Sequence, residues 1–285
     1  MAMMVLLVLA STSVMAQSQR EVSEQGRSGM VELAIEEAAR QIAAQAGQHR
    51  LIVLGELHGT REIPALTSLL LKHYAAQGPV MLALEMPDSE QPALDRYLAS
   101  DGGKEAWQAL AATPFWLVSD DQHDGRRSVQ MRQLIEQVRA LRHQGAAVGV
   151  WAYDVGKDEA DAHDHHWRDQ QMAAHLRAAV TGYPGAVLVL AGNVHAMRAR
   201  PEWAPPELQL APMTSQLLDL EPFAVNLTGA TGHFWGCLSS ARCQAIEARS
   251  WSGDREVRLD RDQGRSYDLW VRLPRLTVAD LMTGG

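Results

Sequence analysis

Short apolar runs recur along the chain, and each one gives way to glycine or to polar residues. They cover residues 51–54, 80–84, 146–153 and 186–191. Runs of this length, bounded by glycine or charged residues, are typical of buried strands rather than of helices. The chain between the first two runs has the length and the helical pattern of a βαβ unit. We therefore predict an α/β fold with a mostly parallel central sheet flanked by helices.

Helical periodicity fills most of the chain between these runs. Residues 88–145 are too long for a simple crossover between the second and third strands, so we expect a helical insertion that covers the site as a lid. Two later strands are expected at residues 223–227 and 266–273, the second alternating as an edge or antiparallel strand would. Residues 249–265 are charge-rich and are expected to form a solvated loop. The helices are expected at residues 30–46, 64–74, 89–99, 104–111, 127–143 and 160–180.

The first apolar run leads directly into candidate chemistry. It reads Leu51-Ile-Val-Leu-Gly-Glu-Leu-His-Gly-Thr60, so Glu56 and His58 follow the strand two residues apart. In an extended chain that spacing puts both side chains on the same side. Ligands of open α/β sheets bind just outside the carboxyl ends of the strands. Glu56 and His58 are therefore expected to face a binding crevice.

The fourth apolar run repeats this design. Ala186-Val-Leu-Val-Leu-Ala-Gly-Asn-Val-His-Ala196 places Asn193 and His195 after the glycine, so both segments share the pattern strand–Gly-x-x-His. A single Gly-x-x-His is a weak signal, because one histidine can simply satisfy the end of its own strand. Two copies, each closing a buried strand, indicate a shared site to which both histidines contribute.

Acidic residues follow the other two predicted strands. Glu85 follows the second and Asp154 the third, and the carboxyl ends of parallel strands lie along one edge. Two imidazoles with carboxylates can bind zinc, manganese or cobalt and leave a position for water, with Glu56, His58, Glu85 and His195 as the expected ligands. The same groups also permit metal-free chemistry, in which His58 is the general base, Glu56 or Glu85 fixes its tautomer, and His195 stabilises the oxyanion. The spacing leaves both alternatives open.

The predicted helix after the third strand adds further charged residues. Arg168 and Asp169 are expected to face inward, because Met172 and Leu176 follow at helical spacing. An inward arginine must find a carboxylate or an anionic ligand, so Arg168 is either part of a structural ion pair or catalytic. The histidines at positions 163, 165 and 166 are expected to lie on an exposed first turn.

Several residues near the strand ends are weaker candidates. Tyr153 and Asn193 adjoin the predicted site along the chain and could donate hydrogen bonds to a substrate. His123 lies in the insertion and is weaker still. The aromatic residues Trp107, Phe115 and Trp116 fit either the roof of a pocket or packing beneath a lid.

Composition narrows the class of function. The 285 residues carry a net charge of -8 and no basic block, which argues against nucleic acid as a principal partner. The sequence has no Gly-x-Ser-x-Gly elbow and no Gly-x-x-x-x-Gly-Lys-Thr loop. A covalent acyl-enzyme and a nucleotide-binding P-loop are therefore disfavoured.

The first residues read as a signal peptide. Residues 3–10 are apolar but too short to span a bilayer, and Val14-Met-Ala16 fits a cleavage pattern, although no lysine or arginine precedes the apolar stretch. Residues 1–16 would be removed, leaving residues 17–285 as a single α/β domain that is periplasmic or secreted and has no transmembrane segment. In that oxidising compartment Cys237 and Cys243, which lie in a loop-like polar segment, are expected to form a disulfide.

These motifs together resemble the superfamily that joins the erythromycin esterases, the ChaN-like haem-uptake proteins, and the TraB/PrgY and Tiki proteases. The resemblance rests on Gly55-Glu-Leu-His58, Glu85, Arg168-Asp-Gln-Gln-Met172 and Gly192-Asn-Val-His195. Asp154 falls where esterase-like members often carry an acidic residue. The signal peptide and modest size are most similar to the ChaN-like branch, but the lipobox cysteine and a Cys-x-x-Cys-His haem attachment site are missing.

The resemblance implies three activities: lactone hydrolysis, metal-dependent peptide hydrolysis, or haem binding. We expect an exported metal-dependent hydrolase acting on an ester or amide of a small-molecule or peptide substrate. The alternative is a non-covalent haem-binding protein of iron uptake, with Tyr153 and Met172 as cofactor-binding residues. A third reading is a catalytically dead scaffold that binds a partner. The expected catalytic residues are Glu56, His58, Glu85, Asp154, Arg168, Asp169, Asn193 and His195.

Overall fold

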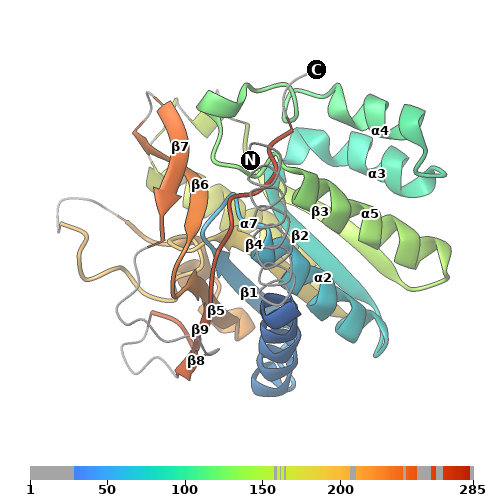
Figure 1. Cartoon of the computed structure of the whole chain (residues 1–285). Helices are drawn as coiled ribbons and strands as arrows, with labels where there is room; N and C mark the ends of the chain where they lie inside the picture. Colours follow the sequence, from blue (N-terminus) through green and yellow to red (C-terminus); the bar gives the residue numbers. More distant parts are fainter. Residues whose placement is uncertain are drawn as a thin grey trace, which may run out of the picture.

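A seven-stranded sheet runs through the molecule with helices on both of its faces (Figure 1). The computed structural model describes residues 29–282 except 157–158, 161, 164, 206–209, 240–241, 249–257 and 261–265, so the predicted signal peptide lies outside the described residues. The strand order is β3-β2-β4-β1-β5-β9-β8, parallel from β3 to β9 and antiparallel only at β8. This confirms the predicted mostly parallel α/β fold. The strands are β1 (Leu51–Glu56), β2 (Val80–Pro87), β3 (Val148–Asp154), β4 (Ala186–Gly192), β5 (Phe223–Gly229), β8 (Arg258–Asp260) and β9 (Leu269–Leu273).

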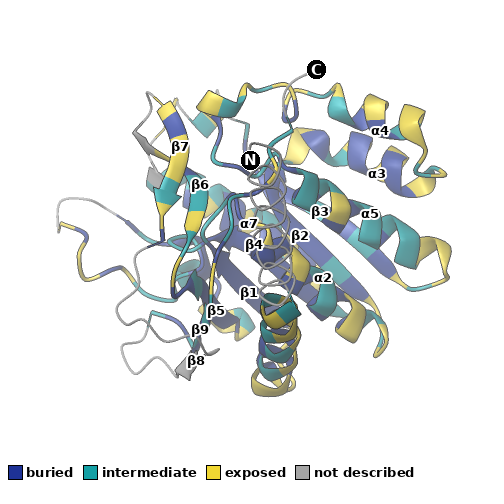
Figure 2. Ribbon diagram, viewed as in Figure 1, coloured by how far each residue is buried: buried dark blue, intermediate teal, exposed yellow. Residues whose placement is uncertain are grey.

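The helices divide between the two faces of the sheet. A helix over residues 29–46 packs on one face with α2, α3, α4 and α5, and α7 packs on the other. Because both faces are covered, the central strands are apolar throughout rather than alternating, and all six residues of β1 are buried (Figure 2). The bounds are α2 (Glu62–Ala75), α3 (Gln91–Ala99), α4 (Lys104–Ala111), α5 (Val129–His143) and α7 (His165–Gly182).

The predicted insertion belongs mostly to the helical layer rather than to a separate lid. Helix α5 packs against α2 and β3, and α3 packs against α4, α5 and β3. The aromatic residues Trp107, Phe115 and Trp116 are buried in the larger core cluster, so they pack beneath the surface rather than line a pocket roof. Helix α5 begins where the Ser128 side chain accepts a hydrogen bond from the Met131 N–H, at 3.2 Å. The chain between α4 and α5, which includes a 3-10 turn at Asp120–Gln122, supplies residues to the site.

The carboxyl-terminal part differs from the sequence-based expectation in two places. Strand β9 pairs antiparallel with β8, which confirms one of the two predicted alternatives, but it is not an edge strand, since it also pairs parallel with β5 and β8 takes the edge. Strand β8 itself lies within residues 249–265, which were expected to be a loop throughout. The pairing partner of a strand is set by tertiary contacts, and the alternation of β9 alone does not reveal it.

A separate two-stranded hairpin lies beside the carboxyl ends of the sheet (Figure 1). Strands β6 (His233–Ser239) and β7 (Arg242–Glu247) are antiparallel, and Cys237 lies directly opposite Cys243. The predicted disulfide joins these two cysteines, but it closes a β-hairpin and not a loop-like segment. Within the described residues, no helix combines the length and the apolarity needed to traverse a bilayer.

Candidate active site

The carboxyl ends of β1, β2 and β4 bring the predicted histidines and carboxylates together. Gly192, the last residue of β4, lies between the two imidazoles. A Cβ added at Gly192 would lie 3.0 Å from His58 Nε2, 3.4 Å from His195 Cδ2 and 3.6 Å from Glu85 Oε2. The predicted meeting of both histidines beside Glu85 is therefore what the structure shows, and a residue without a side chain at position 192 makes room for it.

The first histidine is oriented by its own strand. Glu56 ends β1, and its Oε1 lies 2.9 Å from His58 Nδ1. A carboxylate oxygen only accepts, so Nδ1 carries the proton and the lone pair of the neutral ring is on Nε2. His58 Nε2 faces the Glu85 carboxylate, 3.7 Å from Oε2.

The second histidine, His195, is oriented by a residue of helix α7. His195 Nδ1 lies 2.8 Å from Oδ1 of the fully buried Asp169, and the same oxygen accepts the Met213 N–H at 2.7 Å. On the other side of the ring, His195 Nε2 lies 3.1 Å from Arg168 Nη1. A guanidinium only donates, so His195 Nε2 accepts and its proton is on Nδ1.

Glu85 is the hub of the site. Its Oε1 accepts from Arg168 Nη2 at 2.8 Å and from Arg126 Nη1 at 3.0 Å, and its Oε2 accepts the Gly192 N–H at 2.7 Å. Burial alone would raise the pKa of Glu85, but the surrounding arginines and histidines outweigh burial and hold that pKa well below its usual range. Glu85 is therefore an ionised anchor and not a proton donor.

Arg168 also bridges Glu85 to the end of β3. Its Nε lies 3.0 Å from Asp154 Oδ1 and its Nη2 lies 2.5 Å from Asp154 Oδ2. Burial alone would lower the pKa of Arg168, but the carboxylates of Glu85 and Asp154 both bind its guanidinium and raise that pKa. The inward orientation predicted for Arg168 and Asp169 is confirmed by these contacts.

His58 is held in its protonated form by the charges around it. Burial alone would lower its pKa, but the carboxylates of Asp124, Glu85 and Glu56 reverse the effect and raise the pKa to about 9. At pH 7 roughly 1% of a group with that pKa is neutral. The neutral form is correspondingly the stronger base.

Two charged residues of the site were not anticipated from the sequence. Arg126 donates from Nη1 to the Glu85 backbone oxygen at 2.6 Å, and its Nε lies 3.0 Å from both carboxylate oxygens of Asp124. Both residues come from the irregular segment before α5, which has no periodicity from which an inward side could be inferred. From the sequence alone, Asp124 and Arg126 on either side of Gly125 are typical of a solvent-exposed loop.

The remaining candidates lie outside the cluster of facing side chains. Tyr153 and Met172 are fully buried in the core between α7 and the sheet, and the Tyr153 hydroxyl donates to the Leu190 carbonyl at 3.0 Å. Their assignment as cofactor-binding residues finds no support in this packing. Asn193 contributes its backbone N–H to the Glu56 carbonyl at 2.9 Å. His163 is exposed, as predicted, and stacks on Trp167, but it precedes α7, which begins at His165. His166, on the first turn of α7, is half-buried, so the predicted exposed first turn is only partly confirmed.

The donor arrangement does not fit the expected metal. Among the described residues no group of three or more His, Cys, Asp or Glu side chains is arranged to hold an ion. Two guanidiniums occupy Glu85 Oε1, and one of them also donates to His195 Nε2, so a cation would have to displace fixed positive charges. Metal binding stays a prediction that this geometry does not favour.

Comparison with known proteins reports on the fold. No family model matches the chain, and no curated protein sequence matches it. A succinoglycan biosynthesis protein solved by structural genomics aligns with a TM-score of 0.63 at 12% identity, over 88% of this chain and 98% of that one. The erythromycin esterase EreC, solved as a histidine-to-asparagine variant in its open conformation, aligns at 0.60 and 12% identity, over 82% of this chain and 92% of its own.

A haem-bound ChaN of Campylobacter jejuni aligns less well, with a TM-score of 0.44 at 13% identity over 73% of this chain and 90% of that one. That match is too distant to bear on function. The erythromycin esterase has the same fold as this chain.

Proposed function

We propose that this chain is a hydrolase in which His58 activates water to cleave an ester or an amide. One observation carries the proposal: two imidazoles meet beside Glu85, and each has its Nδ1 held by a carboxylate, at 2.9 Å for His58 and 2.8 Å for His195. A histidine whose tautomer is fixed by a carboxylate is the usual general base of water-activating sites. The fold shared with an erythromycin esterase supports the same class of reaction.

In the proposed step, His58 Nε2 takes one proton from water as the water oxygen attacks the substrate carbonyl carbon. Glu56 accepts the hydrogen bond from His58 Nδ1–H throughout and stabilises the imidazolium that forms. The tetrahedral intermediate then expels its alkoxide or amine, which receives the proton from His58 Nε2. The ring returns to its neutral state, so each turnover consumes one water.

The oxyanion is assigned to Arg168 rather than to His195. The His195 Nε2 accepts from Arg168 Nη1, so in this tautomer it has no proton to donate to an oxyanion. Arg168 places a fixed positive charge next to His195 Nε2, and such a charge stabilises the negative charge that develops on the substrate oxygen. His195 and Asp154 orient the guanidinium from two sides.

No step of this proposal uses a metal or haem. The site residues fit haem no better than a metal, since His195 Nε2 is engaged by Arg168, while Tyr153 and Met172 are buried in the core. We also propose that the protein works in the periplasm or outside the cell. The disulfide between Cys237 and Cys243 supports an oxidising compartment.

The test is hydrolysis of a panel of chromogenic esters and amides by the purified chain and by its His58→Asn variant. His163→Asn is the matched control, because His163 is exposed and lies outside the cluster around Glu85, with its ring stacked on Trp167. We expect turnover that is lost in His58→Asn, kept in the control, and unchanged by a chelator. Turnover that survives His58→Asn would refute the proposal. Turnover abolished by the chelator would favour the metal-dependent hydrolase instead. A Soret band on haem titration without any hydrolysis would favour the haem-binding alternative.

A further inference from the structure

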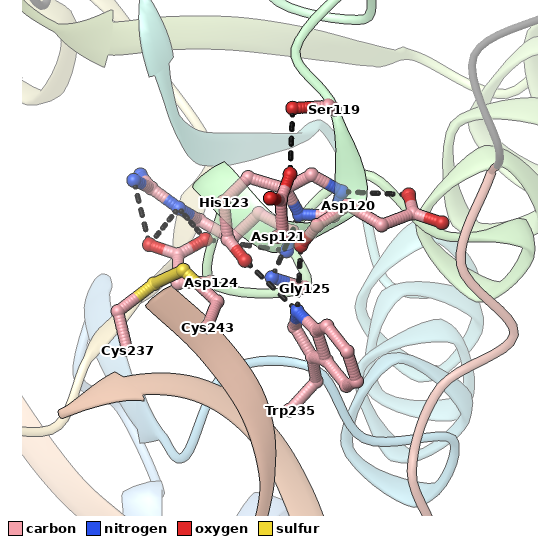
Figure 3. Close-up of a disulfide and its surroundings, with 10 residues drawn as sticks. Ser119, Asp120, Asp121, His123, Asp124, Gly125, Trp235, Cys237 and Cys243 are labelled. Atoms are coloured by element: carbon pink, nitrogen blue, oxygen red, sulfur yellow. Dashed lines mark hydrogen bonds and ion pairs between the residues drawn. A yellow bond between two sulfur atoms is a disulfide. The ribbon is translucent and has the colours of Figure 1, made fainter. Parts of the chain in front are cut away.

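The segment that delivers Arg126 to the site is held from outside by the β6–β7 hairpin. The Trp235 indole Nε1 donates to two backbone oxygens of that segment, at 3.1 Å to Asp120 and at 2.9 Å to His123 (Figure 3). One side chain of the hairpin therefore fixes the backbone of both residues. Asp124 and Arg126 follow directly along the chain.

Three segments that are far apart in the sequence meet at this point without room for a methyl group. Gly59 follows His58, and its carbonyl accepts a hydrogen bond from the backbone N–H of Trp235 at 3.0 Å. A Cβ added at Gly59 would lie 2.6 Å from Trp235 Cβ, and one added at Gly125 would lie 2.4 Å from Gly59 Cα. Both glycines have positive φ, 66° and 88°, a conformation that favours glycine. The turn after His58 and the turn before Arg126 thus pack directly on each other and on the hairpin.

The segment is also rigid internally. His123 is buried, and its Nδ1 accepts the Gly125 N–H at 3.0 Å while its Nε2 lies 3.2 Å from Asp120 Oδ1. Burial lowers the pKa of His123, which favours the neutral ring with its proton on Nε2 that this bonding pattern requires. The chain from Asp120 to Gly125 is therefore cross-linked within itself, and the Trp235 indole bonds it at Asp120 and at His123.

We propose that Trp235 is a positioning residue of the active site and acts through Arg126. Its indole N–H fixes the segment whose next residues are Asp124 and Arg126, and Arg126 in turn holds Glu85 through both its backbone and its side chain. Trp235 is kept in place by the hairpin, in which it pairs with Ala245 two residues from the Cys237–Cys243 disulfide. Figure 3 shows the disulfide below Asp124 and Trp235 below Gly125. This inference rests in part on the proposed hydrolase function.

The test is a double-mutant cycle of Trp235→Phe and Arg126→Ala. Phenylalanine keeps an aromatic ring but removes the N–H donor, and Trp203→Phe is the matched control because Trp203 is 65% exposed. We expect Trp235→Phe to lower kcat by about 10- to 100-fold with little change in KM, since small misplacements of catalytic groups cost this much. In the Arg126→Ala background it should have no further effect. Additive losses, or a loss confined to KM, would overturn the proposal.

A second measurement stands without any substrate. Amide hydrogen exchange should be faster in residues 119–126 of Trp235→Phe than in wild type, and unchanged in Trp203→Phe. Unchanged exchange in Trp235→Phe overturns the proposed role of Trp235 even when the hydrolase function holds. Conversely, faster exchange in a chain that shows no hydrolysis refutes the enzyme and leaves the structural link standing. Arg126→Lys, which keeps the buried positive charge, serves for the cycle where Arg126→Ala does not fold.

Discussion

The two strand–Gly-x-x-His segments build the same pair of groups in different ways. In the β1 segment the carboxylate that orients His58 is Glu56, two residues away on the same strand end. In the β4 segment the carboxylate that orients His195 is Asp169, which comes from α7 and is fixed by the Met213 N–H. Both rings present Nε2 to the cluster around Glu85.

The difference lies in what each Nε2 meets. His195 Nε2 accepts from Arg168 at 3.1 Å, whereas His58 Nε2 faces a carboxylate oxygen at 3.7 Å. A ring bonded on both nitrogens is a structural support, and a ring bonded only through Nδ1 keeps its Nε2 for proton transfer. Repeated sequence motifs therefore need not have equivalent roles, and the variants below test that division.

The largest effect is expected from the residue that both histidines share. Glu85→Gln removes the buried carboxylate that Arg126 and Arg168 share and leaves them only Asp124 and Asp154, which costs about 3 kcal/mol of unfolding free energy, the lower end of the range for breaking a buried pair. Urea unfolding measures this, with Glu37→Gln as the control because Glu37 pairs with Arg40 at the exposed surface. Equal unfolding midpoints for the two variants would mean that Glu85 does not neutralise the buried arginines.

The next effect separates the two rings. We expect His58→Asn to lower kcat/KM by about 10³-fold, within the range typical of a general base. His195→Asn should cost roughly 10- to 100-fold, because it removes an orienting contact to Arg168 but not the base. Steady-state hydrolysis of one ester by both variants gives the ratio. A larger loss in His195→Asn than in His58→Asn would show that His195, and not His58, is the general base.

Most of the fold and most of the charged site follow from the sequence for a physical reason. Strand ends are local features, and a shared parallel edge brings four of them together, so Glu56, His58, Glu85, Asp154 and His195 could be grouped without coordinates. Asp169 followed from helical spacing to Met172.

The two charged residues that were missed depend on tertiary contacts. Arg126 reaches Glu85, and Asp124 reaches Arg126, from a segment whose Gly125 packs on Gly59 beside Trp235. No period, cap or motif in residues 112–128 encodes that contact. For the same reason the β6–β7 hairpin and the edge position of β8 were not predicted.

A pH profile sharpens the comparison further. Since the pKa of His58 is raised to about 9, the neutral base increases with pH, and kcat/KM should rise about tenfold per pH unit until it levels off near 9. Asp124 contributes to this raised pKa, so Asp124→Asn should shift the rising limb of the kcat/KM profile to lower pH. A limb that stays in place in this variant would show that Asp124 does not act on His58.

The smallest effect is expected at the orienting carboxylate of the β1 segment. Glu56→Gln keeps an oxygen that accepts from His58 Nδ1 but removes the charge that stabilises the imidazolium. We expect a loss of about tenfold in kcat/KM, which corresponds to about 1.4 kcal/mol of transition-state stabilisation. A loss equal to that of His58→Asn would show that Glu56 takes part in proton transfer directly.

The division of roles between the rings can be tested most directly by nitrogen-15 NMR titration of the two imidazoles in the substrate-free protein. The account predicts that His58 titrates near pH 9, and that neutral His195 has its proton on Nδ1 and a hydrogen bond at Nε2. A His58 ring that titrates near its ordinary value, or a neutral His195 protonated on Nε2, would contradict the arrangement on which the proposed mechanism rests.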